Sequence, residues 1–208
     1  MNELKGVISV GKYKVLFFVE DNAQEQIIPG LFIRIASNHG IARGDLDIHV
    51  PSSRGGGSIK ALKEYLKDYG DELVADCIVL GSDGNCKGLN EKRKQLEKNL
   101  QKVECDYTLI LTIPDPHIEH WYLLDSNALS LAVGESVADH APRKKCEKNH
   151  YKTLLKDAIQ SSGVIPLQGG AEYGSEIANE IDLYKASKAE QGFAFFEEQV
   201  KSWAKSLA

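Results

Sequence analysis

Residues 13–20 read YKVLFFVE, an almost unbroken apolar run that ends in an acid. Such a run is typical of a central parallel strand that is buried on both faces. Residues 23–36 then carry apolar side chains at helical spacing, and Pro29 favours a kink there or a helix that begins near it. A buried strand followed at once by a helix is the repeating unit of an α/β fold.

Three further strand-like runs follow, at residues 45–50, 73–81 and 106–113. Amphipathic helical patterns occupy residues 59–69 and 89–100, between these runs. Residues 126–134, 149–161 and 173–206 are also helical in pattern. The alternation predicts an α/β fold whose parallel, Rossmann-like sheet is flanked by helices. We expect this core in residues 1–125 and a helical C-terminal cap, packed on the core, in residues 126–208.

The composition is that of an ordinary globular protein. The 208 residues are 42 % hydrophobic and 26 % charged, and the formal net charge is −5. Bulk charge therefore gives no sign of nucleic-acid binding, which would need a local basic patch.

Two features bear on location. The first residues do not resemble a signal peptide, and no apolar run approaches the roughly 20 residues of a membrane span, so we expect a cytoplasmic protein with no membrane partner. The four cysteines form no C-x-x-C pair, which favours free thiols in a reducing compartment, with Cys77 in the core.

Acidic residues follow three of the expected strands: Glu20 the first, Asp83 the third, and Asp115 with Glu119 the fourth. The carboxyl ends of parallel strands meet at one edge of a sheet, where clustered carboxylates repel unless a cation neutralises them. We therefore predict that these four acids bind Mg²⁺ or Mn²⁺, which prefer oxygen ligands. The alternative is that strands end in polar residues simply because loops are polar.

Other side chains could complete such a site. His117 could transfer a proton, Lys87 and Lys152 could stabilise phosphate charge, and Asp125 could orient a metal ligand.

Two segments could contact substrate phosphates. PSSRGGGSIK, at residues 51–60, offers Arg54 and Lys60 beside a helix N-terminus, although a plain turn explains its glycines equally well. RKKCEKNHYK, at residues 143–152, offers Lys145 and Lys152 for a nucleic-acid backbone and Tyr151 for stacking. A solvated charge run is the competing explanation for the second segment.

The segments VEDNAQE, SDGNCKG, IPDPHIEHWYLLD and KCEKNHYK, with a later GGAEY, resemble small bacterial proteins with a TOPRIM-like domain. TOPRIM is the metal-binding domain of topoisomerases, primases and OLD-family nucleases. The resemblance implies an acid after the first strand, matched by Glu20, and a second acid one helical turn later, matched by Glu25. It also implies an Asp-x-Asp pair after a later strand, where this chain has Gly81 in the first position and Asp83 in the second.

The leading hypothesis from the sequence is a metal-dependent phosphodiesterase that acts on nucleic acid. The resemblance further implies a role beside an ATPase in anti-phage defence, and a homo-oligomer is compatible with it. The rival is a non-catalytic subunit that binds nucleic acid or a partner protein, favoured by Gly81 where an acid is expected. A third candidate is a phosphoester enzyme that acts on a nucleotide.

Overall fold

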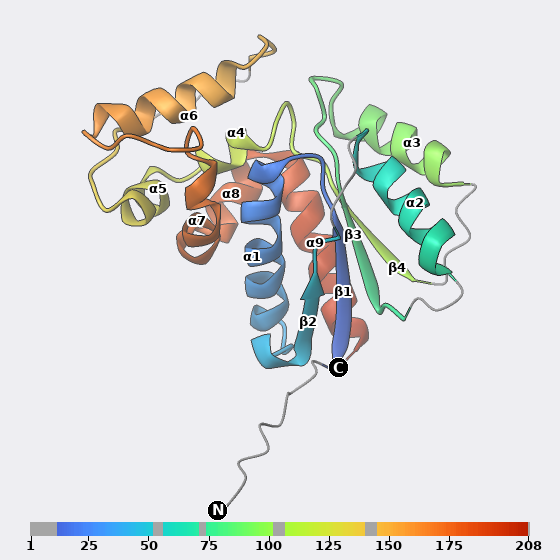
Figure 1. Cartoon of the computed structure of the whole chain (residues 1–208). Helices are drawn as coiled ribbons and strands as arrows, with labels where there is room; N and C mark the ends of the chain where they lie inside the picture. The colour runs from blue at the N-terminus through green and yellow to red at the C-terminus, as the bar shows by residue number, and fades with distance from the viewer. Residues whose placement is uncertain (1–11, 52–55, 71–73, 102–106, 140–144, 208) are drawn as a thin grey trace, which may run out of the picture.

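A parallel sheet forms the centre of the protein, as expected (Figure 1). The structure is a computed structural model that describes residues 12–51, 56–70, 74–101, 107–139 and 145–207. Its sheet has the order β2-β1-β3-β4 and every pairing is parallel. The strands are β1 (Tyr13–Phe18), β2 (Leu46–His49), β3 (Cys77–Gly81) and β4 (Thr108–Thr112). The expected α/β fold is therefore confirmed.

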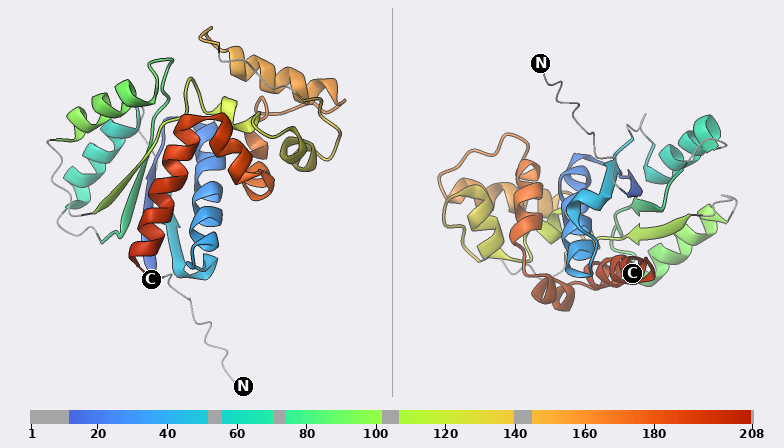
Figure 2. Two further views of the ribbon diagram at one scale, coloured as in Figure 1. Left: turned by 180° about the vertical axis from the view of Figure 1, so that it is seen from behind. Right: turned by 90° about the horizontal axis from the view of Figure 1, so that it is seen from below.

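Helices cover both faces of the sheet (Figure 2). Side chains alternate along β1, so Val15 and Phe17 join the core under α1 (Asn22–Asn38) and α9 (Gln191–Ser206). Leu16 and Phe18 join the core under α2 (Ser58–Tyr69) and α3 (Leu89–Leu100). All four of these strand residues are buried, which explains why the run that contains them is almost wholly apolar.

Helix α1 begins at the carboxyl end of β1, earlier than Pro29 suggested. The Asp21 carboxylate accepts a hydrogen bond from the Gln24 amide at 3.0 Å and caps the first turn. Pro29 lies inside the helix, which continues to Asn38. The expectation of a helix that starts near the proline is wrong, because the Asp21 cap fixes the start.

The C-terminal half completes the core. It contains α4 (Glu119–Tyr122), α5 (Ser126–Val133), α6 (His150–Ser161), α7 (Gly174–Glu180) and α8 (Leu183–Ala189), with a short 3₁₀ turn at Ala171–Tyr173. A similar turn in the N-terminal half, Arg43–Asp45, precedes β2. Helix α9 packs on β4 and α1, and the Trp121 ring meets the Phe193 ring at 4.9 Å between centroids. Both rings are fully buried. Helix α6 lies beside α4, beyond the carboxyl ends of the strands (Figure 1).

The helices are amphipathic. Helix α3, for example, buries Leu96 and Leu100 and exposes most of its charged residues. Within the described residues, no helix is both long enough and apolar enough to cross a membrane.

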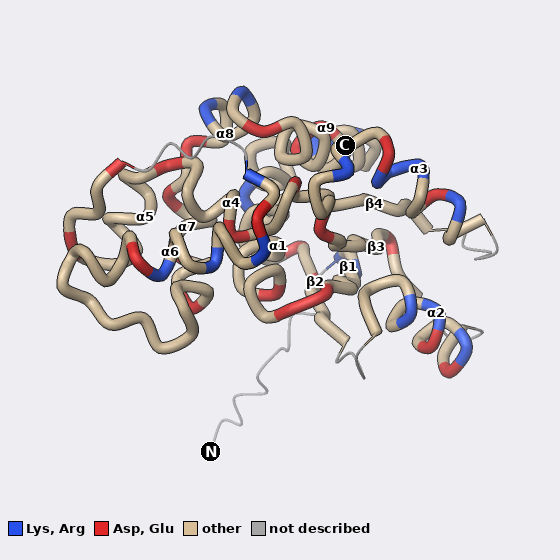
Figure 3. The backbone as a smooth tube through the Cα atoms, turned by 90° about the horizontal axis from the view of Figure 1, so that it is seen from above, with Lys and Arg blue, Asp and Glu red and all other residues tan. Residues whose placement is uncertain are grey.

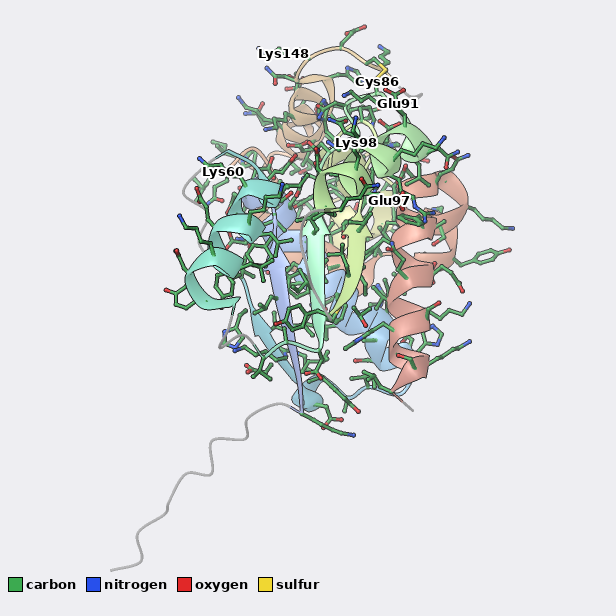
Figure 4. All side chains as sticks on the ribbon, turned by 90° about the vertical axis from the view of Figure 1, so that its right-hand side faces the viewer. Lys60, Cys86, Glu91, Glu97, Lys98 and Lys148 are labelled. Atoms are coloured by element: carbon green, nitrogen blue, oxygen red, sulfur yellow. A yellow bond between two sulfur atoms is a disulfide. The ribbon has the colours of Figure 1, made fainter. Side chains whose placement is uncertain are left out.

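A disulfide links Cys86 to Cys146 (Figure 4). The expectation that all cysteines are free thiols is therefore wrong. The segment before α6 returns to the loop after β3, so the two residues lie 5.8 Å apart at Cα although 60 positions separate them. Cys77 is a free, fully buried thiol, as expected, and burial raises its pKa. Cys105 lies outside the described residues.

Candidate functional site

Glu20 and Asp83 are in direct contact at the carboxyl edge of the sheet, the edge that faces the viewer in Figure 3. The Asp83 amide donates a hydrogen bond to Glu20 Oε2 at 3.1 Å, and Ser82 Oγ donates to Glu20 Oε1 at 2.7 Å. Strands β1 and β3 are hydrogen-bonded neighbours, which brings their ends together. Glu20 is exposed to solvent, whereas the Asp83 side chain is only 13 % exposed.

Gln24 joins the two acids, a role that the sequence did not suggest. Its Oε1 accepts a hydrogen bond from the Glu20 amide at 3.0 Å, and its Nε2 donates to Asp83 Oδ1 at 2.9 Å. The side chain is fully buried. A Cβ atom added at Gly81 would lie 2.5 Å from Gln24 Oε1. Gln24 therefore occupies the space into which the first acid of an Asp-x-Asp pair would extend.

Glu25 is exposed on the first turn of α1. The neighbouring Gln24 is the residue of this turn that contacts Glu20 and Asp83. The expectation that Glu25 supports the site is not met by this geometry, because adjacent positions on a helix point in different directions.

His117 contacts the other oxygen of Asp83. Its Nδ1 lies 3.0 Å from Asp83 Oδ2, and the Ile118 amide donates to Asp83 Oδ1 at 3.2 Å. The hydrogen bond with Asp83 raises the pKa of His117 above its ordinary value. The Asp83 carboxylate thus favours the charged imidazolium and fixes the orientation of the ring.

Asp115 lies behind the loop that carries Asp83. Its Oδ1 accepts a hydrogen bond from the Cys86 amide at 2.9 Å, and the residue is 5 % exposed. Gly84 packs against it so closely that an added Cβ would lie 2.6 Å from Asp115 Oδ1. This geometry supports a role in holding the Asp83 loop in place, whereas the sequence suggested a metal ligand.

Glu119, at the start of α4, lies opposite Lys152 of α6. Its Oε1 lies 3.5 Å from Lys152 Nζ, and the same ammonium lies 3.9 Å from Asp21 Oδ2. Its Oε2 is buried and has no hydrogen-bond partner among the described residues. Burial raises the pKa of the carboxyl above its ordinary value.

Lys92 is a second residue that the sequence did not single out. It lies in the first turn of α3 and is only 8 % exposed. Burial lowers its pKa, and the nearby charges of Glu20 and Asp83 oppose that shift. A signal was present, because Lys92 falls on the same helical stripe as Leu96 and Leu100, where an apolar residue is expected.

The remaining predicted residues lie apart from the paired acids or have other partners. Lys87 Nζ donates to Gln95 Oε1 at 3.0 Å, and Lys60 Nζ lies 3.7 Å from Glu64 Oε1 on α2. Asp125 caps α5 through the Asn127 amide. The predicted Arg54 falls outside the described residues.

The other oxygen of Asp125 accepts a hydrogen bond from the Asp182 amide at 3.0 Å, which ties the start of α5 to the start of α8. Tyr151 is fully buried, stacks beside His120 at 4.8 Å, and accepts a hydrogen bond from the Lys145 amide. The expectation that Tyr151 stacks on a nucleic-acid base is therefore wrong, because the ring belongs to the core beneath α6.

No protein-family model, curated protein or solved structure matches the chain. Its function is therefore inferred from the side chains gathered around Glu20 and Asp83.

Proposed function

We propose that the protein is a divalent-metal-dependent phosphodiesterase that acts on nucleic acid. The observation that carries this proposal is the contact between Glu20 and Asp83 at the open carboxyl edge of the sheet. Ligands of parallel α/β sheets bind at this edge. Mg²⁺ or Mn²⁺ would be the bound metal, as the TOPRIM-like resemblance also implies.

The donor set fits a cation held by few protein ligands. Among the described residues, no group of three or more His, Cys, Asp or Glu side chains has the geometry to hold a metal ion. Magnesium commonly uses one or two carboxylates and takes its other ligands from water and substrate phosphate. Glu20 and Asp83 supply two, and the exposure of Glu20 leaves room for water. A metal bound there would activate water and neutralise charge on the reacting phosphoryl group.

The chain's own residues would perform the other steps. His117, oriented by Asp83, would use its second ring nitrogen to move a proton. Lys92, buried beside the two acids, would hold a phosphate oxygen. The N-terminus of α2 lies close by, since a Cβ added at Gly57 would lie 3.7 Å from Glu20 Oε1. Among the described residues no side-chain hydrogen bond caps this helix, and its first amides would bind a phosphate.

The TOPRIM-like resemblance extends this proposal to a wider role. Lys145 and Lys152, near the start of α6, would contact the nucleic-acid backbone. An ATPase would be the partner protein, in a system of anti-phage defence.

The rival function is a non-catalytic subunit that binds nucleic acid or a partner protein. The observation that favours it is the set of groups already around the acids. Gln24 fills the space beside Gly81, and His117 and Lys92 offset the charges of Asp83 and Glu20 without a metal. In such a subunit the acids would keep their positions but would bind no metal and catalyse no hydrolysis.

A cleavage assay separates the two functions. Wild type, Asp83→Asn and Glu198→Gln would be incubated with single- and double-stranded DNA, RNA and tRNA, with Mg²⁺ or Mn²⁺ and with EDTA. Glu198 is an exposed carboxylate on α9 and serves as the matched control. We expect metal-dependent cleavage by wild type and the control, and a loss of about 100-fold or more in Asp83→Asn. The absence of metal-dependent cleavage, or equal cleavage by Asp83→Asn, would contradict the proposal.

A further inference from the structure

A cavity of about 750 Å³ lies between the start of α1 and α6. Its wall includes Asp21 at the start of α1, Glu119 from α4, and Lys152 and Lys156 from α6. Gln168 of the loop after α6 closes another part of the wall. A volume of this order accommodates a molecule of nucleotide size. Glu119 of the wall interacts electrostatically with Asp83, so the cavity lies near the proposed metal site.

One side chain of the cavity wall, Glu119, has a buried polar atom without a hydrogen-bond partner within the described residues. Glu119 is 4 % exposed, and its buried Oε2 accepts no hydrogen bond within the described residues. An unsatisfied buried acceptor is destabilising, and more so when it is charged. A ligand hydroxyl or amino group that hydrogen-bonds the Glu119 carboxyl at the wall would offset that cost. The wall therefore favours a hydrogen-bond donor at this position.

The charges of the cavity wall limit how many negative charges a ligand can carry. Asp21 and Glu119 oppose Lys152 and Lys156, so the four side chains sum to zero. Lys152 is already shared between the two carboxylates, at 3.9 and 3.5 Å, whereas Lys156 is exposed on the next turn of α6. A single phosphate suits this balance, because a chain of phosphates would place several negative charges beside two carboxylates.

We propose that this cavity binds one nucleoside monophosphate unit, with its phosphate at Lys156 and Lys152 and a sugar hydroxyl or base amino group at Glu119. This inference rests on the proposed function for the choice of a nucleotide among phosphate esters. It deepens that function, because it assigns a place for one nucleotide of the nucleic acid next to the acids that would bind the metal. The unit is either a free mononucleotide or the terminal nucleotide of a strand.

The test is calorimetric titration of the full chain in EDTA, so that it does not depend on a metal or on cleavage. The probes are uridine and adenosine 5′-monophosphates, the matching nucleosides, inorganic phosphate, and a short oligonucleotide with a terminal phosphate. The variants are Lys156→Ala, Glu119→Gln and, as the matched control, Lys148→Ala. Lys148 is an exposed lysine that precedes α6 and does not belong to the cavity wall (Figure 4).

We expect saturable binding of the monophosphates, at least fivefold tighter than that of inorganic phosphate or the nucleosides. Lys156→Ala should weaken monophosphate binding at least fivefold, and Lys148→Ala should leave it unchanged. Glu119→Gln should weaken monophosphates while leaving inorganic phosphate unaffected. Oligonucleotide binding as tight as that of the monophosphates, or tighter, would identify a strand end as the source of the unit. Markedly weaker oligonucleotide binding would identify a free mononucleotide as the source.

The proposal is overturned if folded wild type binds no monophosphate, or if Lys156→Ala and Glu119→Gln both bind as wild type does. The far-ultraviolet circular dichroism of each variant shows whether it is folded. Nucleotide binding without any metal-dependent cleavage would support the cavity and contradict the phosphodiesterase. Metal-dependent cleavage without monophosphate binding would support the phosphodiesterase and contradict the nucleotide-binding cavity.

Discussion

The main-chain amide of Asp83 donates a hydrogen bond to Glu20 Oε2 over 3.1 Å, although 63 positions separate the two residues. The contact exists because β1 and β3 are parallel neighbours whose carboxyl ends meet. Gln24 bridges the same two residues from α1, and His117 holds the second oxygen of Asp83. One network thus fixes both acids with oxygens that retain lone pairs for a further ligand.

Introducing an acid at position 81 should destabilise the protein. In Gly81→Asp the new Cβ would lie 2.5 Å from Gln24 Oε1, and overpacking of this kind costs about 1–3 kcal/mol. Urea denaturation measures the loss. Gln24→Ala in the same chain makes room for the new side chain, so the double variant should lose less stability than the two single losses added together. Strict additivity would contradict the overlap of the two side chains.

The Cys86–Cys146 bond should stabilise the chain in oxidising buffer. It closes a loop of 60 residues, and a disulfide of this kind contributes about 2–4 kcal/mol. Cys146→Ser should lose that amount in urea denaturation without reductant, and the two proteins should converge when reductant is added. Peptide mapping without reduction provides the direct check. Coincident curves in both buffers, with no linked peptide, would contradict the pairing.

Glu190 should make stability depend on pH. It is buried, caps α9, and accepts hydrogen bonds from Trp121 Nε1 and the Phe193 amide at 2.7 Å each. Burial raises its pKa above the unfolded value of 4.5. Below pH 4.5 the carboxyl is protonated in both the folded and the unfolded state, and its contribution to stability is fully present. This contribution is lost as pH rises through the folded-state pKa, because the folded protein must then bury a charged carboxylate.

The comparison with Glu190→Gln isolates this effect, because every other titrating group is common to both proteins. The unfolding free energy of wild type should fall relative to that of Glu190→Gln as pH rises from about 4 to about 7. Denaturation at several pH values measures it. Parallel profiles would show that burial does not perturb the Glu190 carboxyl.

Lys92 should weaken metal binding at the paired acids. Its buried ammonium interacts with Glu20 and Asp83 and would repel a divalent cation bound to them. Lys92→Met should tighten Mn²⁺ binding by about fivefold, the effect of about 1 kcal/mol of repulsion. Lys94→Met, an exposed position on the same helix, is the control. Equal Mn²⁺ affinities in all three proteins would show that the ammonium does not act on the metal site.

The main elements of the fold could be predicted because their sequence signals are local. The apolar run at β1 and the helical spacing after it identify a buried strand and its crossover helix. The convergence of Glu20 and Asp83 follows from the general geometry of parallel sheets. Only the structure shows that β1 and β3 are neighbours, since strand order depends on how the crossovers pack.

The details that define the site depend on tertiary contacts. Gln24 and Glu25 are adjacent in the sequence, and only the packing of α1 decides which of them faces Asp83. Cys86 pairs with Cys146 because the segment before α6 packs against the loop after β3. The spacing of the cysteines in the sequence does not predict this contact. Lys92 is the exception, because a lysine on the apolar stripe of α3 could have been noticed.

Calorimetric titration with Mn²⁺ tests the central claim most directly. Wild type, Glu20→Gln, Asp83→Asn and the control Glu198→Gln would be compared after removal of metal with EDTA and dialysis. Saturable binding by wild type and Glu198→Gln, weakened at least about tenfold in both Glu20→Gln and Asp83→Asn, is the predicted result. Absence of binding by wild type, or equal binding by all four proteins, would contradict a metal site shared by Glu20 and Asp83.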